Sequence, residues 1–208
     1  KECLKQLIDA GLDSLPGGGA EILLDRVRNI ISKVKCNSSE WLSVMKEAHK
    51  MNLTTSATMM FGHVETEEER IEHIIKIRDA QIYKPESSKG FISFTPWPFQ
   101  AENTGLKKQY PQISAVSEEQ YIRIIAISRI LLPNIKNIQA SWLTVGYNAA
   151  SRALNAGAND LGSIMIEENV VSSAGAKYKI NKEQMENLIR KSGFLPAQRD
   201  QEYNIVMG

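Results

Sequence analysis

Apolar and polar residues follow two different periods along this chain, and together they predict strands alternating with helices. Short β-branched or apolar runs bounded by turn residues predict five strands, at 12–15, 53–60, 91–95, 137–140 and 161–164. Apolar residues three or four positions apart predict amphipathic helices at 2–10, 20–31, 39–51, 66–80, 117–132, 147–156 and 181–191. The uncharged run LTTSATMM, residues 53–60, is typical of a buried parallel strand.

The order of these elements favours an α/β fold with a parallel sheet, because strands joined by helices form right-handed βαβ units. Five such strands are consistent with a doubly wound sheet or with most of a (βα)8 barrel, and the pattern alone leaves both open. No linker or low-complexity stretch divides the 208 residues, so we expect one domain over 1–208. The sequence begins within a helical pattern, and its first residue is not Met. We therefore expect it to be part of a longer protein.

Composition narrows the class of partner. Lys and Arg number 25 against 24 Asp and Glu, and this balance argues against binding to nucleic acid or to an anionic membrane. No apolar stretch approaches the roughly 20 residues that span a bilayer. The two cysteines, Cys3 and Cys36, fit a reduced, cytoplasmic compartment and match no CxxC-type metal motif, so we expect no metal ligands in this chain.

Candidate ligand-contacting residues follow the carboxyl ends of the predicted strands, where parallel α/β folds build their sites. The three glycines in LPGGGAE, residues 15–21, allow close approach of a ligand or simply form a tight turn, and they match neither GxGxxG nor a P-loop. In TMMFGHVET, residues 58–66, a His and a Glu follow a glycine. They form no zinc pattern, and Glu65 also suits the start of a helix.

Aromatic and acidic residues stand at two further strand ends. Trp97 and Phe99 lie in TPWPFQ, held stiffly by prolines, and Trp142 lies in SWLTVG. Such aromatics either form a wall against a flat ligand or cover the rim of the sheet. Asp160 stands at the start of the last predicted strand, and Glu167 and Glu168 follow that strand.

These five segments occur together and in this order in a group of radical-SAM enzymes of menaquinone and deazaflavin biosynthesis. GLDSLPGGGAEIL resembles the fourth barrel strand and its loop, ATMMFGHVETEEERIEH the fifth, GFISFTPWPFQAENTGL the sixth, NIQASWLTVG the seventh and GANDLGSIMIEENVVSSAGA the eighth. The resemblance covers residues 4–199. It implies a partial (βα) TIM barrel, strands four to eight of a radical-SAM barrel, with a C-terminal helical extension over about 166–208.

The resemblance also implies an activity. The group uses S-adenosylmethionine with a four-iron four-sulfur cluster, a nucleoside-derived small molecule and an electron donor that the sequence does not identify. Trp97 in PWPFQ, Ser141–Trp142 and EENVV at 167–171 favour the cyclase branch of the futalosine pathway. There a radical removes hydrogen from the sugar 4′ carbon of dehypoxanthine futalosine. The carbon radical then attacks the substrate's own aromatic ring, and loss of an electron and a proton restores aromaticity.

Alternatives remain open: an aminofutalosine synthase-like enzyme, a two-electron TIM-barrel lyase with Glu21, Glu65 or Asp160 as base, or a non-catalytic nucleoside binder. Under the radical-SAM reading, Asp160 or Glu21 would accept the released proton. The remaining roles fall into two sets of residues. Those expected to contact S-adenosylmethionine are Ser14, Gly17, Gly18, Gly19, Thr58, Met60, Gly62 and Glu65, with Thr58 replacing the first Gly of the group's GxIxGxxE-type segment. Those expected to contact substrate are His63, Trp97, Phe99 and Trp142.

The chain departs from the group in one important respect: it contains no CxxxCxxC motif, which in the group holds the iron–sulfur cluster. These residues alone are therefore expected to be inactive. Five strands cannot close an eight-stranded barrel, so strands 12–15 and 161–164 should each lack a neighbour. We also expect the inner face to expose apolar side chains such as Met59, unless an N-terminal half or a partner chain covers it.

Overall fold

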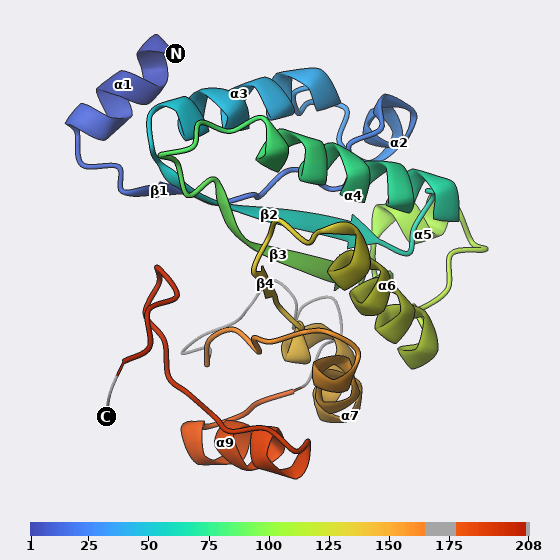
Figure 1. Cartoon of the computed structure of the whole chain (residues 1–208). Helices are drawn as coiled ribbons and strands as arrows, with labels where there is room; N and C mark the ends of the chain where they lie inside the picture. The colour runs from blue at the N-terminus through green and yellow to red at the C-terminus, as the bar shows by residue number, and fades with distance from the viewer. Residues whose placement is uncertain (165–177, 207–208) are drawn as a thin grey trace.

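The computed structural model describes residues 1–164 and 178–206 and consists of a parallel sheet with helices packed along it (Figure 1). The strands are β1 (Ser14–Leu15), β2 (Thr54–Phe61), β3 (Phe91–Pro98) and β4 (Asn137–Ile138). The helices are α1 (Glu2–Asp9), α2 (Asp25–Ile31), α3 (Ser38–Lys50), α4 (Glu67–Ile82), α5 (Gly105–Gln109), α6 (Glu118–Leu131), α7 (Trp142–Asn155) and α9 (Lys182–Lys191). Within the described ranges, no helix has the length and apolar character needed to cross a membrane.

The four strands pair in parallel and in sequence order, β1-β2-β3-β4, as predicted. All four carboxyl ends therefore meet at one edge, and this arrangement is compatible with part of a (βα) barrel. Near that edge Met60 of β2 is level with Trp97 of β3. The turns after β1, β2 and β3 are consequently close neighbours.

Some predicted elements differ from the structure. No strand forms over 161–164; instead Asp160 makes a single parallel bridge to Gln139. Gly162 breaks the extended course there because its φ is +77°. The helix expected over 20–31 begins only at Asp25, after an irregular turn, and the short α5 was not predicted. The expected extension over 166–208 contains α9, while residues 165–177 lie outside the described part.

The helix predicted over 147–156 begins earlier, at Trp142, and is broken at Gly146. The φ of Gly146 is +81°, and a Cβ there would stand 2.6 Å from the Tyr178 ring. A glycine is therefore required where the Tyr178 ring packs on this turn. The other long helices begin at capping boxes, formed at Asn37, Thr66, Ser117 and Asn181.

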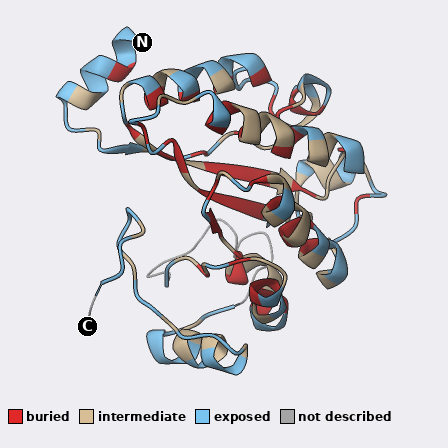
Figure 2. Ribbon diagram, in the orientation of Figure 1, coloured by how far each residue is buried: buried red, intermediate tan, exposed pale blue. Residues whose placement is uncertain are grey.

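The core lies between the sheet and the helices, and it corrects one expectation. Met59 is fully buried, together with Phe61, Phe91 and Phe94, on the face that α3, α4, α6 and α7 cover (Figure 2). The prediction that the Met59 side chain is exposed to solvent on the inner face is wrong, because this chain alone buries it. The strand's two-residue period turns Met59 outward, and the inner face receives Ser56, Thr58 and Met60 instead.

Two buried histidines make the stability of this core depend on pH. Burial lowers the pKa of His49 to about 4 and that of His73 to about 3, from 6.5. Both side chains are therefore neutral in the folded protein at pH 7, and the Leu23 amide donates to His73 Nδ1 at 3.0 Å.

We expect the contribution of these histidines to the unfolding free energy to be fully present above pH 6.5 and to fall as pH drops below it. The unfolded state then binds protons that the folded state does not bind. Each histidine contributes up to about 1.4 kcal/mol per pH unit between pH 6 and 5. Urea titrations of the protein and of a His49→Gln variant at several pH values measure this slope. An unchanged slope in the variant would contradict the assignment to His49.

Candidate functional site

The inner face of the sheet borders a cavity of about 510 Å³. Its wall comes from the turn after β1, from β2 and β3, from Gln139 and from the C-terminal segment. Five of the residues predicted from the sequence line it: Ser14, Gly17, Gly18, Thr58 and Trp97. Barrel interiors are normally packed with branched apolar side chains, so a polar, hollow inner face marks a place for a ligand.

The glycine turn after β1 is fastened to β2 by reciprocal hydrogen bonds. The Gly17 amide donates to Ser56 Oγ (3.1 Å), and Thr58 Oγ1 donates to the Gly17 carbonyl (2.6 Å). A Cβ on Gly17 would stand 2.4 Å from the Ser56 carbonyl oxygen, whereas one on Gly18 would meet no atom within 4 Å. Gly17 is thus needed for packing, and Gly18 leaves open space beside the cavity.

Hydroxyl and amide groups of three adjacent strands form a polar row across the inner face. Thr58 is level with Thr95 in the β2–β3 register, and Gln139 follows β4 one residue further on. Thr95 Oγ1 donates to Gln139 Oε1 at 3.3 Å. Trp97, which is 42% exposed, stands on the same face nearer the carboxyl edge.

The C-terminal residues 198–206 fold into a hairpin that closes the cavity near the beginnings of the strands. Arg199 bridges to Ile205, and Asp200 Oδ1 accepts the amides of Glu202 and Asn204 within the turn. Arg199 and Tyr203 point into the cavity wall beside Ser93. The guanidinium carbon of Arg199 lies 3.8 Å from the centre of the Tyr203 ring, a cation–π contact.

Asp160 anchors this hairpin. Arg199 holds both of its oxygens, with Nε 3.0 Å from Oδ1 and Nη2 2.8 Å from Oδ2, and the Tyr203 hydroxyl donates to Oδ2 at 3.0 Å. Burial, and then the Asp160 charge, raise the pKa of Tyr203 to about 12. The predicted role of Asp160 as proton acceptor stays a prediction, and in this geometry both carboxylate oxygens already have donors.

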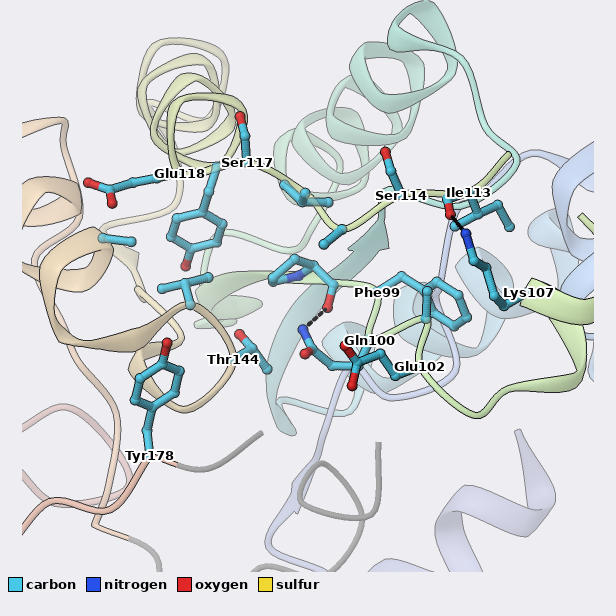
Figure 3. Close-up of a pocket in the computed structure, with 17 residues that line it drawn as sticks. Phe99, Gln100, Glu102, Lys107, Ile113, Ser114, Ser117, Glu118, Thr144 and Tyr178 are labelled. Atoms are coloured by element: carbon cyan, nitrogen blue, oxygen red, sulfur yellow. Dashed lines mark hydrogen bonds between the residues drawn. The ribbon is translucent and has the colours of Figure 1, made fainter. Parts of the chain in front are cut away.

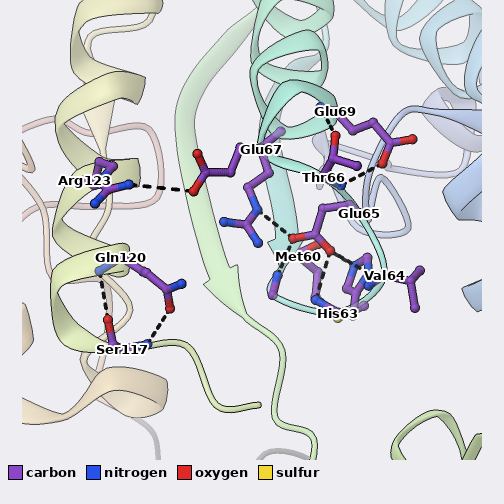
Figure 4. Close-up of polar contacts among 12 residues, drawn as sticks. Met60, His63, Val64, Glu65, Thr66, Glu67, Glu69, Ser117, Gln120 and Arg123 are labelled. Carbon is purple, nitrogen blue, oxygen red and sulfur yellow. Dashed lines mark hydrogen bonds and ion pairs between the residues drawn. The ribbon is translucent and has the colours of Figure 1, made fainter. Parts of the chain in front are cut away.

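A buried knot of polar groups forms the turn after β2 (Figure 4). Glu65, whose side chain is 0% exposed, accepts the amides of Gly62 and His63 and the Nε of Arg70, at 2.5, 2.9 and 2.7 Å. His63 Nε2 contacts the Met60 carbonyl at 2.9 Å, and its Nδ1 lies 2.8 Å from Glu65 Oε2. Burial alone would raise the pKa of Glu65, but His63, the Gly62 amide and Arg70 lower it to about 2.

The knot therefore shapes the loop at the sheet's carboxyl edge, and the side chains of His63 and Glu65 satisfy one another. Neither side chain lines either cavity, and their predicted ligand contacts stay predictions. Gly62 has a φ of +90°, and a Cβ there would stand 2.2 Å from Val116. The loop is thus pressed against the segment that leads into α6.

A second cavity, of about 450 Å³, lies between the loop after β3 and the beginnings of α6 and α7 (Figure 3). Phe99, predicted to contact substrate, lines this cavity and not the inner-face one. Lys107, on its edge, donates to the carbonyls of Pro111 and Ile113. Figure 3 shows Thr144 and Tyr178 on the opposite wall.

The remaining predicted residues lie elsewhere. Trp142 is 3% exposed and stacks on Tyr147, so it belongs to the core around α7. Glu21, the alternative proton acceptor, pairs with Lys35 at 2.6 Å, and its carbonyl accepts the Met60 amide. The Gly19 carbonyl accepts from Arg28, and Gly19 lines neither cavity.

Several polar residues of the cavity were missed in the sequence, among them Ser93, Thr95, Gln139, Arg199 and Tyr203. Ser93 and Thr95 share the two-residue period of Trp97, so alternation within FISFTPW could have indicated them. Gln139, Arg199 and Tyr203 gave no such signal. Gln139 follows a strand that is too short to show a period. Arg199 and Tyr203 are placed at the cavity by contacts with Asp160, which is distant in the sequence.

These features define an α/β protein with a ligand-sized cavity on the inner face of a parallel sheet. Residues 88–207 match the family model described as the CofH/MqnC C-terminal region, and the chain belongs to this family. The resemblance found in the sequence is thereby confirmed.

Curated relatives agree with this assignment. A cyclic dehypoxanthine futalosine synthase of Halalkalibacterium halodurans is 43% identical over 206 residues, 99% of this chain and 54% of the relative. One of Streptomyces coelicolor is 44% identical over 203 residues, 98% of this chain and 49% of the relative. A 5-amino-6-(D-ribitylamino)uracil–L-tyrosine 4-hydroxyphenyl transferase of Archaeoglobus fulgidus is 42% identical over 209 residues, 99% of this chain and 59% of the relative. The chain thus spans about half the length of these relatives.

The two cofactors expected from the resemblance fit these residues differently. The open space at Gly18, beside a cavity at the sheet's inner face, suits close approach of a ligand such as S-adenosylmethionine. An iron–sulfur cluster bound by three thiolates does not fit, because the chain has two cysteines. In the described part of the chain, no three His, Cys, Asp or Glu side chains gather as metal ligands.

Proposed function

We propose that this chain forms the substrate-holding part of a radical-SAM enzyme that cyclises dehypoxanthine futalosine to cyclic dehypoxanthine futalosine in menaquinone biosynthesis. The observation that supports this most is the ligand-sized cavity on the inner face of a parallel sheet, in a chain 43–44% identical to two synthases of that name. A cavity of about 510 Å³ is within the usual range for small-molecule sites.

The residues of this chain bind, orient and enclose the substrate. Trp97 offers a flat apolar face to an aromatic ring, and the row of Thr58, Thr95 and Gln139 offers hydrogen bonds to sugar oxygens. The hairpin at 198–206 lines the cavity near the beginnings of the strands. Holding the sugar and the ring in one geometry favours attack of one on the other.

S-adenosylmethionine, when bound, supplies the hydrogen-abstracting chemistry that starts such a cyclisation. The residues of this chain that border its proposed place are Ser14, Gly17 and Gly18 in the turn after β1, with Gly19 beyond them. The loop shaped by Glu65, with Gly62 and the neighbouring Met60, lies at the same edge.

Turnover by the complete gene product tests this proposal. The protein is reconstituted anaerobically with iron and sulfide, reduced, and given S-adenosylmethionine and dehypoxanthine futalosine. We expect a product lighter than the substrate by two hydrogen atoms, because one hydrogen is abstracted and a proton and an electron are then lost. Mass spectrometry measures it. Absence of this product from cluster-loaded protein would contradict the proposal.

A second candidate is supported by the near-equal identity, 42%, to the Archaeoglobus fulgidus transferase. Under that alternative, the substrates are L-tyrosine and 5-amino-6-(D-ribitylamino)uracil, as in the name of that relative. The same preparation, given these two compounds in place of dehypoxanthine futalosine, distinguishes the alternatives by which product forms. We expect no transfer product.

A further inference from the structure

The inner face of β2 and β3 is richer in hydroxyl groups than a barrel interior needs to be. Seven of the cavity's lining residues bear a side-chain hydroxyl on this side of the sheet: Ser14, Thr54, Ser56, Thr58, Ser93, Thr95 and Tyr203, whereas the Thr55 hydroxyl contacts His49 in the core. Branched apolar residues would fill a packed interior at these positions. Polar groups that face a cavity retain their hydrogen-bonding demand, so they favour a polar occupant.

The central row of this face has hydrogen-bonding capacity left over. Thr58 Oγ1 gives its proton to the Gly17 carbonyl and accepts no hydrogen bond in the described ranges, so its lone pairs are available. Thr95 Oγ1 gives its proton to Gln139 Oε1 and likewise keeps lone pairs. Gln139 Nε2 donates to no acceptor in the described ranges, so two donors stand beside two acceptors.

The two ends of the cavity differ in chemistry. Trp97, level with Met60 at the carboxyl edge, offers an exposed indole face. At the other end Arg199 and Tyr203 are locked to Asp160, so the floor is rigid and its charges are neutralised. An occupant therefore meets an aromatic surface first, a polar row next and a closed floor last.

We propose that Thr58, Thr95 and Gln139 form a polyol subsite that binds neighbouring hydroxyls of the substrate's sugar, while Trp97 contacts its aromatic ring. Neighbouring hydroxyls both donate and accept, and the row supplies acceptors at two threonines and donors at one amide. The subsite rests on the proposed function for the identity of the substrate. The ligand class is a ring compound bearing a ribosyl or ribityl chain, and a purely apolar ligand would not use this row.

Calorimetric titration of the complete gene product with two ligands tests the subsite. The ligands are dehypoxanthine futalosine and its analogue in which hydrogen replaces the sugar's neighbouring hydroxyls. The variants are Thr95→Val, which keeps the shape, and Gln139→Met. Ser128→Ala, whose hydroxyl donates to the Ile124 carbonyl within α6, is the control on a distant buried hydroxyl.

We expect Thr95→Val and Gln139→Met each to weaken binding of the hydroxylated ligand by roughly 2- to 12-fold, the loss of one hydrogen bond. Binding of the deoxygenated analogue should be unchanged, and Ser128→Ala should bind both ligands as the wild type does. Equal losses for the two ligands, or no loss for either, would overturn the subsite while leaving the proposed function in place. A wild-type protein that binds neither ligand would overturn both.

Discussion

Replacing Glu65 by Gln should cost about 3–5 kcal/mol of unfolding free energy, the usual result of removing one partner from a buried ion pair. The Glu65 side chain is 0% exposed, and the Arg70 side chain is only 14% exposed. Gln has the same shape but no charge, and its NH₂ group would face the amide donor of either Gly62 or His63, which donate to different oxygens of Glu65. The variant therefore leaves one buried donor without an acceptor and Arg70 without its counter-charge. Urea titration at pH 7 measures the loss.

Glu67→Gln, two residues further along at the first position of α4, is the matched control. Glu67 lies 3.7 Å from Arg123, and both side chains are more than 60% exposed, at 70% and 62% (Figure 4). Exposed pairs of this kind contribute about 0–1 kcal/mol. If the two variants lost equal stability, the knot around Glu65 would not hold the loop after β2 as the hydrogen bonds indicate.

Gly17→Ala is the second large effect, with an expected loss of about 1–3 kcal/mol from overpacking. The new Cβ would stand 2.4 Å from the Ser56 carbonyl oxygen and 2.8 Å from Ala57 Cα. Both atoms belong to the backbone of β2, so no side chain can move aside. The turn must therefore shift away from β2 and lose the hydrogen bonds to Ser56 and Thr58.

The neighbouring glycine supplies the control. A Cβ on Gly18 meets no atom within 4 Å, so Gly18→Ala should leave stability within about 0.5 kcal/mol of wild type. Thermal and urea unfolding of both variants measure the difference. A Gly18 variant as unstable as the Gly17 variant would show that turn conformation, and not contact with β2, sets the requirement for glycine.

The sequence predicted the sheet better than the site. Period and turn residues place β2 and β3 well because these strands are long, and the parallel order follows from the helices between them. Leu161–Ile164 reads as a strand by composition, but a positive φ at Gly162 stops the pairing after Asp160. Composition does not encode that backbone angle.

The site was predicted in part for a related reason. Strand ends identified Ser14, Gly17, Gly18, Thr58 and Trp97, because carboxyl ends of parallel strands converge. Trp142 and Phe99 also follow strands, yet one packs in the core and the other faces the second cavity. Residues near the C-terminus reach the cavity through long-range contacts such as the Arg199–Asp160 pair, 39 positions apart in the chain, and local patterns do not reveal such pairs.

The location of bound substrate tests the central claim most directly, namely that the polar inner face of the sheet is the substrate site. The measurement is a crystal structure of the complete gene product with dehypoxanthine futalosine. We predict that the sugar lies within hydrogen-bonding distance of Thr95 and Gln139, with the ring against Trp97. Substrate bound in the cavity beside Phe99 instead, with none on the inner face, would contradict it.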